Sequence, residues 1–170
     1  DIKNAVHATA VYPWIEQGRT VMVTGANGYL RRVVFAALLV TPGIHKVIAL
    51  VRNPARFDGV NEPLLPQGIE VVDISALDTG NFQLGYIDVI CHLASGRPIH
   101  KNQGIAESLK FTQKIISAAI KNQVPGFINA SSQSVYGMQY TPLWSEETPP
   151  GPETAYAQSK WASEVMASAI

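Results

Sequence analysis

The amino-acid sequence predicts an α/β fold built on a doubly wound parallel sheet. Short runs rich in Val and Ile alternate with longer segments of helical period, which is the pattern of parallel strands connected by covering helices. A glycine-rich turn, TGANG, stands between the first such run and the first helical segment. With 170 residues, of which 46% are apolar, the chain is expected to form one domain that buries about 70% of its unfolded surface.

Five strands and three helices follow from these patterns, taken in chain order. The strands are expected near residues 20–24, 46–51, 69–73, 87–93 and 126–130. Two helices are expected at 28–40 and 103–122, and a third begins near Thr154. The apolar stripe with which the first helix should pack on the sheet comprises Leu30, Val33, Val34, Ala37 and Leu38. The corresponding stripe of the second helix comprises Ile105, Leu109, Thr112, Ile116, Ala119 and Ile120.

Composition and charge exclude several classes of function. Thirteen basic residues balance thirteen acidic ones, so neither a nucleic acid nor a membrane surface is expected as a partner. The four histidines and the single cysteine, Cys91, show no paired ligand spacing, and no metal site is predicted. The longest apolar run, Val33 to Val40, is too short to cross a bilayer, so the expected location is the cytoplasm.

The turn after the first strand has the composition of a dinucleotide-binding turn. Gly25 and Gly28 would let the backbone turn tightly and bring its N–H groups close to a pyrophosphate at the positive end of helix 28–40. Arg31 stands where such turns have a third glycine, which permits close packing of helix on strand. Its side chain could bind a phosphate, or it could weaken cofactor binding. The interpretation we favour is a solvated arginine beside a slightly displaced helix.

Residues at two strand ends indicate which dinucleotide binds. The second strand ends at Arg52, where an acidic residue would bind the ribose hydroxyls of NAD and an arginine would bind the 2′-phosphate of NADP. Arg52, with Arg56 close behind, therefore favours NADP, and NAD is the alternative. Asp73 ends the third strand and could meet the adenine edge, although it could equally be an ordinary acidic residue that closes a strand.

Residues near the fifth strand and the third helix suggest redox chemistry on a carbonyl or an alcohol. Tyr156 and Lys160 are four residues apart, so a helix puts both on one face, although Lys160 could instead pair with Glu164. An ammonium near the phenol would lower the tyrosine pKa from about 10 toward the working range, which suits a proton donor and acceptor. Ser132, after the fifth strand, could hydrogen-bond the same substrate oxygen.

Four segments together resemble one enzyme family. TGANGYL at 24–30, DVICHLAS at 88–95, SSQSVYG at 131–137 and YAQSK at 156–160 are similar to motifs of the extended short-chain dehydrogenases/reductases, in the branch of nucleoside-diphosphate-sugar epimerases, dehydratases and reductases. The resemblance spans roughly residues 20–170.

The resemblance implies a Rossmann fold with the sheet order 3-2-1-4-5. It further implies that Ser132 and Tyr156 touch the reacting oxygen and that Lys160 also holds the nicotinamide ribose. The residues expected at the cofactor are Gly25, Asn27, Gly28, Tyr29, Leu30, Arg52, Asp73, Leu93, Ala94, Tyr156 and Lys160.

Departures from the family pattern bear on the reaction. Gln133 and Ser134 follow the predicted catalytic serine, where the 4,6-dehydratases of the family usually carry an acid pair or a glutamate that eliminates water. Without that acid, dehydration is disfavoured relative to 4-epimerisation or keto reduction. A further departure is Ser108, which stands where many members have an asparagine.

The resemblance therefore predicts an NAD(P)-dependent oxidoreductase or epimerase that transfers hydride at a sugar carbon, C4, of a nucleoside-diphosphate sugar. Two alternatives stay open. One is an NADPH-dependent reductase of a hydrophobic ketone, of the dihydroflavonol or hydroxysteroid type. The other is a non-catalytic nucleotide-binding remnant or sensor. A homodimer formed through helices 103–122 and 154–170 is also expected by analogy with the family.

The expected organisation is a short extension followed by an incomplete domain. Residues 1–18 carry no readable signal, and residues 19–170 form the predicted dinucleotide-binding domain. A doubly wound sheet normally continues further, whereas the chain ends at Ile170 inside the helix that begins near Thr154. The C-terminal substrate-binding part is therefore expected to be absent from this chain.

Overall fold

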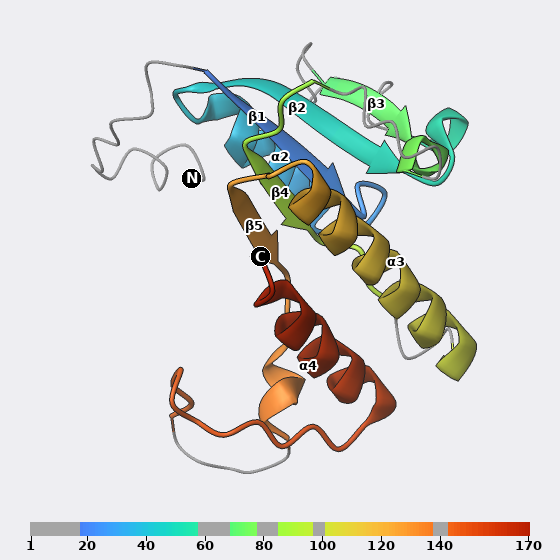
Figure 1. The fold of residues 1–170 in the computed structure, drawn as a ribbon, viewed down its shortest axis with the longest axis vertical. Coiled ribbons are helices and arrows are strands. Elements are labelled where there is room, and N and C mark those ends of the chain that lie inside the picture. Colours follow the sequence, from blue (N-terminus) through green and yellow to red (C-terminus); the bar gives the residue numbers. More distant parts are fainter. Residues whose placement is uncertain (1–17, 58–68, 78–84, 97–100, 138–142) are drawn as a thin grey trace.

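A parallel sheet of five strands forms the centre of the protein (Figure 1). The computed structural model describes residues 18–57, 69–77, 85–96, 101–137 and 143–170, so the predicted extension lies outside it except for Gly18. The strands are β1 (Arg19–Thr24), β2 (Ile44–Val51), β3 (Ile69–Asp73), β4 (Val89–His92) and β5 (Gly126–Asn129). Their order is β3-β2-β1-β4-β5, and all neighbours are parallel. The predicted strands and sheet order are confirmed, with boundaries that shift by up to two residues.

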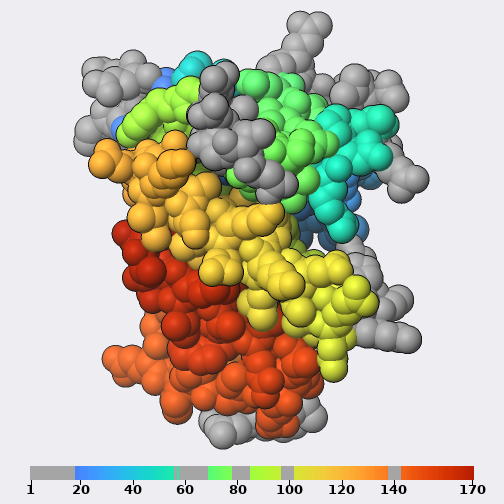
Figure 2. Space-filling model, turned by 45° about the vertical axis from the view of Figure 1, so that its right-hand side comes forward, coloured from blue at the N-terminus to red at the C-terminus, as the bar shows by residue number. Residues whose placement is uncertain are grey.

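Helices cover both faces of the sheet. The helices are α2 (Arg31–Val40), α3 (Lys101–Lys121) and α4 (Ala155–Ala167). Val23 of β1 belongs to the core cluster that contains Phe35 of α2, while the preceding Met22 belongs to a second cluster with Ile115 of α3. Because successive strand residues point to opposite faces, α2 and α3 lie on opposite sides of the sheet. Figure 2 shows α3 (yellow) and α4 (red) packed along a common boundary.

The first helix begins three residues later than predicted, at Arg31 rather than at Gly28. The preceding residues form turns instead, in which the Gly28 N–H donates to the Gly25 carbonyl at 2.8 Å and the Arg31 N–H donates to the Gly28 carbonyl at 3.3 Å. Residues 28–30, which the helical pattern assigned to the helix, therefore belong to these turns.

The predicted apolar stripe of this helix is wrong at two positions. Leu30 and Val33 are 53% and 51% exposed, whereas Arg31 and Phe35, one turn apart, are the buried residues of α2. The error arises because residues 33–40 are all apolar, so periodicity alone does not define which face is buried.

The other two helices differ less from their predictions. α3 begins two residues early and buries Ile115, while Ile120 of its predicted stripe is 51% exposed. α4 begins after Thr154 as predicted, and the Thr154 hydroxyl accepts the Ala157 N–H at 3.1 Å. It ends at Ala167 rather than continuing to the end of the chain.

Candidate active site

The predicted site residues on the sheet lie at one edge, where the parallel strands have their carboxyl ends. β1 leads into Gly25, β2 into Arg52 and β4 into Leu93–Ala94, while β3 ends at Asp73 and β5 leads toward Ser132. The strand order reverses between β1 and β4, and in such sheets ligands bind in the crevice outside the carboxyl ends at this point.

Gly25 brings the turn after β1 into contact with the end of β4. Its φ is +67°, in the left-handed region, and a Cβ atom at this position would lie only 2.7 Å from the Ala94 nitrogen. At Gly28 a Cβ would lie 3.0 Å from the Gly25 carbonyl oxygen. Backbone packing therefore requires glycine at position 25, and the contact of both glycines with a cofactor stays a prediction.

The N-terminus of α2 has no side-chain cap. Leu30 holds the N-cap position with a helical backbone, and the first turn of this helix contains no acidic residue. Asn27 and Tyr29 beside it are exposed, Tyr29 by 86%. A helix end of this kind directs N–H groups and the positive end of the helix dipole outward, which is the environment that binds phosphate groups.

Arg31 is buried on the inner face of α2, with only 8% of its surface exposed. The favoured interpretation of a solvated arginine is therefore wrong. The position of the third glycine in such turns faces the neighbouring strand, so a residue that replaces it is enclosed whatever its charge. Arg31 is also the first residue of α2.

The two strand-end residues that were expected to select the dinucleotide differ in their surroundings. Arg52 is exposed directly after β2. The Asp73 carboxylate accepts the Ser75 N–H at 2.7 Å, and hydrogen bonds from the Ser75 backbone and hydroxyl lower the pKa of Asp73. Asp73 thus starts the short 3-10 helix η4 (Ile74–Leu77), in line with the alternative of a residue that closes the strand. The Arg56 side chain lies outside the described residues.

Lys160 is held in the second turn of α4 and is only 7% exposed. Its Nζ donates to the Ala130 carbonyl at 2.6 Å, immediately after β5. Burial lowers the pKa of Lys160, and the nearby Glu164 opposes this by raising it. The Glu164 carboxylate itself accepts the Ser131 hydroxyl, so Lys160 and Glu164 both tie α4 to the segment after β5.

Ser132 and Tyr156 belong to segments that pack on each other. Ser132 caps the 3-10 helix η6 (Gln133–Tyr136), where its hydroxyl lies 2.9 Å from the Ser134 hydroxyl and accepts the Ser134 N–H at 3.3 Å. Tyr156 is half-buried in the first turn of α4. η6 packs against α4, which brings the two segments together.

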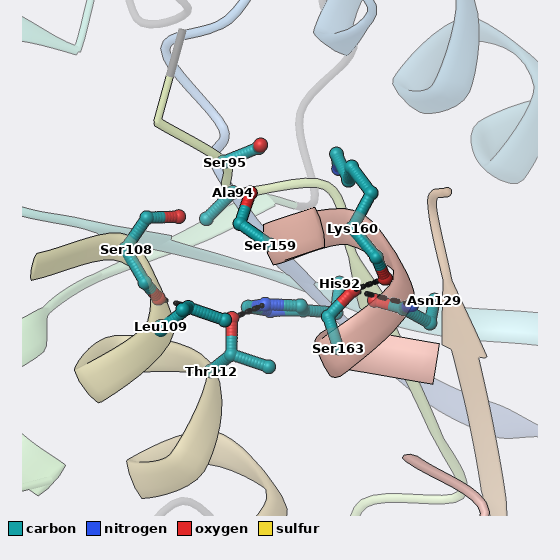
Figure 3. Close-up of a pocket in the computed structure, with 10 residues that line it drawn as sticks. All are labelled: His92, Ala94, Ser95, Ser108, Leu109, Thr112, Asn129, Ser159, Lys160 and Ser163. Carbon is teal, nitrogen blue, oxygen red and sulfur yellow. Dashed lines mark hydrogen bonds between the residues drawn. The ribbon is translucent and has the colours of Figure 1, made fainter. Parts of the chain in front are cut away.

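A small polar cavity adjoins Lys160 (Figure 3). Its lining consists of His92, Ala94, Ser95, Ser108, Leu109, Thr112, Asn129, Ser159, Lys160 and Ser163. Of the predicted site residues, the cavity includes Ala94 and Lys160. The polar residues His92, Asn129 and Ser163 were missed by the sequence interpretation, although a histidine in the apolar strand DVICHLA signals a buried group that must be hydrogen-bonded.

None of the helices in the described ranges is long and apolar enough to cross a membrane. Among the same residues, no group of three or more His, Cys, Asp or Glu side chains is arranged to hold a metal ion.

The sequence of residues 21–170 matches the profile of the NAD dependent epimerase/dehydratase family. The chain belongs to this family. The resemblance drawn from the four motifs is thereby confirmed, and the parallel sheet of the structure is the family's Rossmann fold.

Known proteins similar to the chain include sugar-nucleotide enzymes. A dTDP-glucose 4,6-dehydratase of Actinoplanes is 30% identical over 85 residues, which cover 47% of this chain and 27% of that protein. The structure of a UDP-Glc/GlcNAc 4-epimerase from Campylobacter jejuni matches with a TM-score of 0.75 and 21% identity over 87% of this chain and 47% of that one. A UDP-glucuronic acid 4-epimerase from Bacillus cereus, solved with NAD, matches with a TM-score of 0.69 and 25% identity over 88% and 51%. This family member therefore spans about half the length of these two solved enzymes and 27% of the dehydratase.

Proposed function

We propose that this chain is the dinucleotide-binding part of an enzyme that transfers hydride at C4 of a nucleoside-diphosphate sugar, as an epimerase or a reductase. The observation that carries the proposal is the burial of Lys160 beside a polar cavity, next to the segment that contains Ser132. Membership of an NAD-dependent family and the likeness to UDP-sugar 4-epimerases support it.

The residues at the carboxyl edge of the sheet fit a dinucleotide. The uncapped start of α2 would hold the pyrophosphate through backbone N–H groups near Gly28 and Leu30, with Asn27 and Tyr29 at the rim. The exposed Arg52 would bind the 2′-phosphate of NADP, and NAD, with which the B. cereus epimerase was solved, is the alternative. A nicotinamide dinucleotide bound there supplies the group that accepts and returns hydride.

Three side chains would then handle the proton and the substrate oxygen. The Tyr156 hydroxyl passes the proton, and Lys160 stands one turn further along the same helix, α4. Ser132 orients the reacting oxygen by a hydrogen bond, which requires its hydroxyl to exchange Ser134 for the substrate. Gln133 and Ser134 offer no acid to expel water, so epimerisation or reduction is favoured over dehydration.

The cofactor assignment can be tested by titrating NADPH and NADH into the purified protein and following nucleotide fluorescence. The expected result is tighter binding of NADPH, with a preference that Arg52→Asp reverses. Equal affinities in both variants would remove Arg52 from the site. An Arg31→Gly variant measured in parallel tests whether the enclosed arginine weakens binding.

The reaction can be tested by incubating the protein with NADPH and UDP-sugars. A reductase consumes NADPH in proportion to product, whereas an epimerase forms product without net consumption. Tyr156→Phe is expected to keep dinucleotide affinity and lose at least about a hundredfold in turnover. Undiminished turnover by this variant would overturn the assignment of Tyr156.

A second candidate function is nucleotide binding without turnover. It is favoured by the cavity itself, which is lined by Lys160 but by neither Ser132 nor Tyr156. Dinucleotide binding with no product from any sugar nucleotide would support it. A homodimer through α3 and α4 remains a prediction that sedimentation of the purified protein would test.

A further inference from the structure

Three buried polar side chains form a hydrogen-bonded chain from the sheet into α3. Thr24 ends β1, His92 ends β4 and Thr112 lies in α3; they are 0%, 2% and 3% exposed. His92 Nδ1 lies 2.8 Å from Thr24 Oγ1, and His92 Nε2 lies 2.9 Å from Thr112 Oγ1. Figure 3 shows the link from His92 to Thr112 beside the cavity. Polar atoms buried this deeply are costly unless every donor meets an acceptor.

The direction of each hydrogen bond follows from the end of the chain in α3. The single hydroxyl hydrogen of Thr112 goes to the Ser108 carbonyl at 3.0 Å, so Thr112 Oγ1 must accept from His92 Nε2. A neutral imidazole has only one N–H, so His92 Nδ1 accepts the Thr24 hydroxyl. Thr24 Oγ1 in turn accepts the Ala94 N–H at 3.3 Å.

The surroundings of His92 keep it neutral. The rings of Phe111 and Phe127 lie with their centroids 5.8 and 6.0 Å from the imidazole. Burial, together with the positive charge of Lys160, lowers the pKa of His92 to about 4. The ordered chain is therefore the form present at neutral pH.

We propose that neutral His92 is a positioning residue for the dinucleotide turn: through Thr24 it holds the Ala94 backbone against Gly25, and through Thr112 it ties this contact to α3. His92 does not touch the cofactor in this account. The contact that it controls is unusually close, since a Cβ on Gly25 would lie 2.7 Å from the Ala94 nitrogen. The part of the proposal that concerns dinucleotide affinity rests on the proposed function.

Two substitutions of His92 separate its two links. His92→Asn places a side-chain oxygen near the position of Nδ1 and can still accept from Thr24, whereas His92→Gln places an amide near Nε2 and keeps the link to Thr112. Hydrogen exchange of the Ala94 amide should accelerate at least about tenfold in His92→Gln and change by less than about threefold in His92→Asn. The NADPH dissociation constant should rise in the same order, by about tenfold and less than about threefold.

The Asp88 amide is an internal control for this experiment. It donates to the Thr20 carbonyl at 3.0 Å, at the opposite end of the same pair of strands. Selective loss of protection at Ala94 supports positioning. Equal acceleration at Ala94 and Asp88, or equal effects of the two substitutions, would show a structural role only and overturn the proposal.

Further measurements decide the question if a His92 variant fails to fold. Nitrogen-15 NMR of the unmodified protein should show His92 as the neutral Nε2–H tautomer, and an Nδ1–H tautomer would overturn the proposal. Thr24→Val should expose the Ala94 amide more than Thr112→Val does, and the reverse order would contradict it. If the expected exchange pattern appears but neither NADPH nor NADH binds, positioning of the turn is supported and the proposed function fails.

Discussion

The N-termini of the helices α2 and α4 are built differently. α4 satisfies its own end, because the Thr154 hydroxyl accepts the Ala157 N–H. α2 begins at Leu30 without a side-chain cap and follows a glycine turn that touches β4. The comparison suggests a division of labour between the two helices. The backbone N–H groups at the start of α2 are available to a ligand, whereas α4 is capped by its own threonine and contributes side chains to the site.

The largest effect is expected from adding a side chain at Gly25, where the turn before α2 packs against the Ala94 backbone. Gly25→Ala puts a Cβ within 2.7 Å of the Ala94 nitrogen at a φ of +67°. The substitution should destabilise the protein by about 4 kcal/mol in chemical denaturation, from left-handed strain and overpacking together. NADPH binding, measured by fluorescence, should fall by at least about a hundredfold.

Gly85→Ala is the matched control for this substitution. Gly85 has a φ of +75°, but a Cβ there meets nothing within 4 Å. It should therefore cost only about 1–2 kcal/mol and leave NADPH affinity unchanged. Equal losses in the two variants would mean that strain alone, and not contact with β4, requires glycine at position 25.

Acidification should disrupt the hydrogen bonds of His92, which hold the turn before α2, and leave the Thr154 cap of α4 intact. The pKa of His92 is about 4 in the folded protein, below its ordinary value of 6.5, so the stability linked to neutral His92 is complete above pH 6.5. It is lost as the pH falls toward 4, by about 3 kcal/mol in total. Denaturation curves between pH 7 and 4 measure this loss.

Exposed His45 supplies the control for that pH dependence. His45→Gln should leave the loss of stability in place, while His92→Asn should reduce it. At pH 4 the Ala94 amide should lose protection relative to its intrinsic exchange rate, while the Ala157 amide, bonded to Thr154, keeps its protection. An undiminished pH dependence in His92→Asn would assign the titration to another group.

A negative charge at the uncapped N-terminus of α2 should weaken dinucleotide binding without destabilising the helix. Leu30→Asp places a carboxylate where the pyrophosphate is proposed to lie, and NADPH affinity should fall about tenfold more than in the neutral control Leu30→Asn. Thermal stability should not fall, because an acidic residue suits a helix N-terminus. Equal affinities in the two variants would argue against a phosphate at this end.

Removing the cap of α4 should have the smallest effect. Thr154→Ala should cost about 1 kcal/mol in denaturation experiments, because the Ala157 N–H loses its acceptor. Thr154→Ser, which keeps the hydroxyl, is the matched control and should cost less. A large change of NADPH affinity in Thr154→Ala alone would contradict the division of labour between the two helices.

The same comparison shows how far the sequence could predict the structure. The five strands were predictable because buried parallel strands are short apolar runs, and Thr154 was predictable as the start of α4 because threonine is a favoured cap. The order of the sheet came from the family resemblance. The buried face of α2 could not be predicted, because residues 33–40 are all apolar. Its start could not be predicted either, because the residues before Arg31 form tight turns.

The details of the site were harder to predict than its place in the fold. The strand ends identify one edge, where Gly25 and Ala94 meet, but hydrogen bonds between distant segments depend on geometry that spacing does not contain. Lys160 bonds the Ala130 carbonyl, and His92 joins two threonines from separate elements. Neither contact has a sequence signature beyond the presence of a polar residue in a buried segment.

Mapping of backbone amide shifts tests the central claim most directly. When NADPH or NADH is added to the nitrogen-15-labelled protein, the amides of residues 25–30 and of Ala94 should shift by more than those of the self-capped start of α4 at Thr154 and Ala155. That pattern would show a dinucleotide at the uncapped end of α2. Unchanged amides at residues 25–30 with saturating dinucleotide would contradict the account.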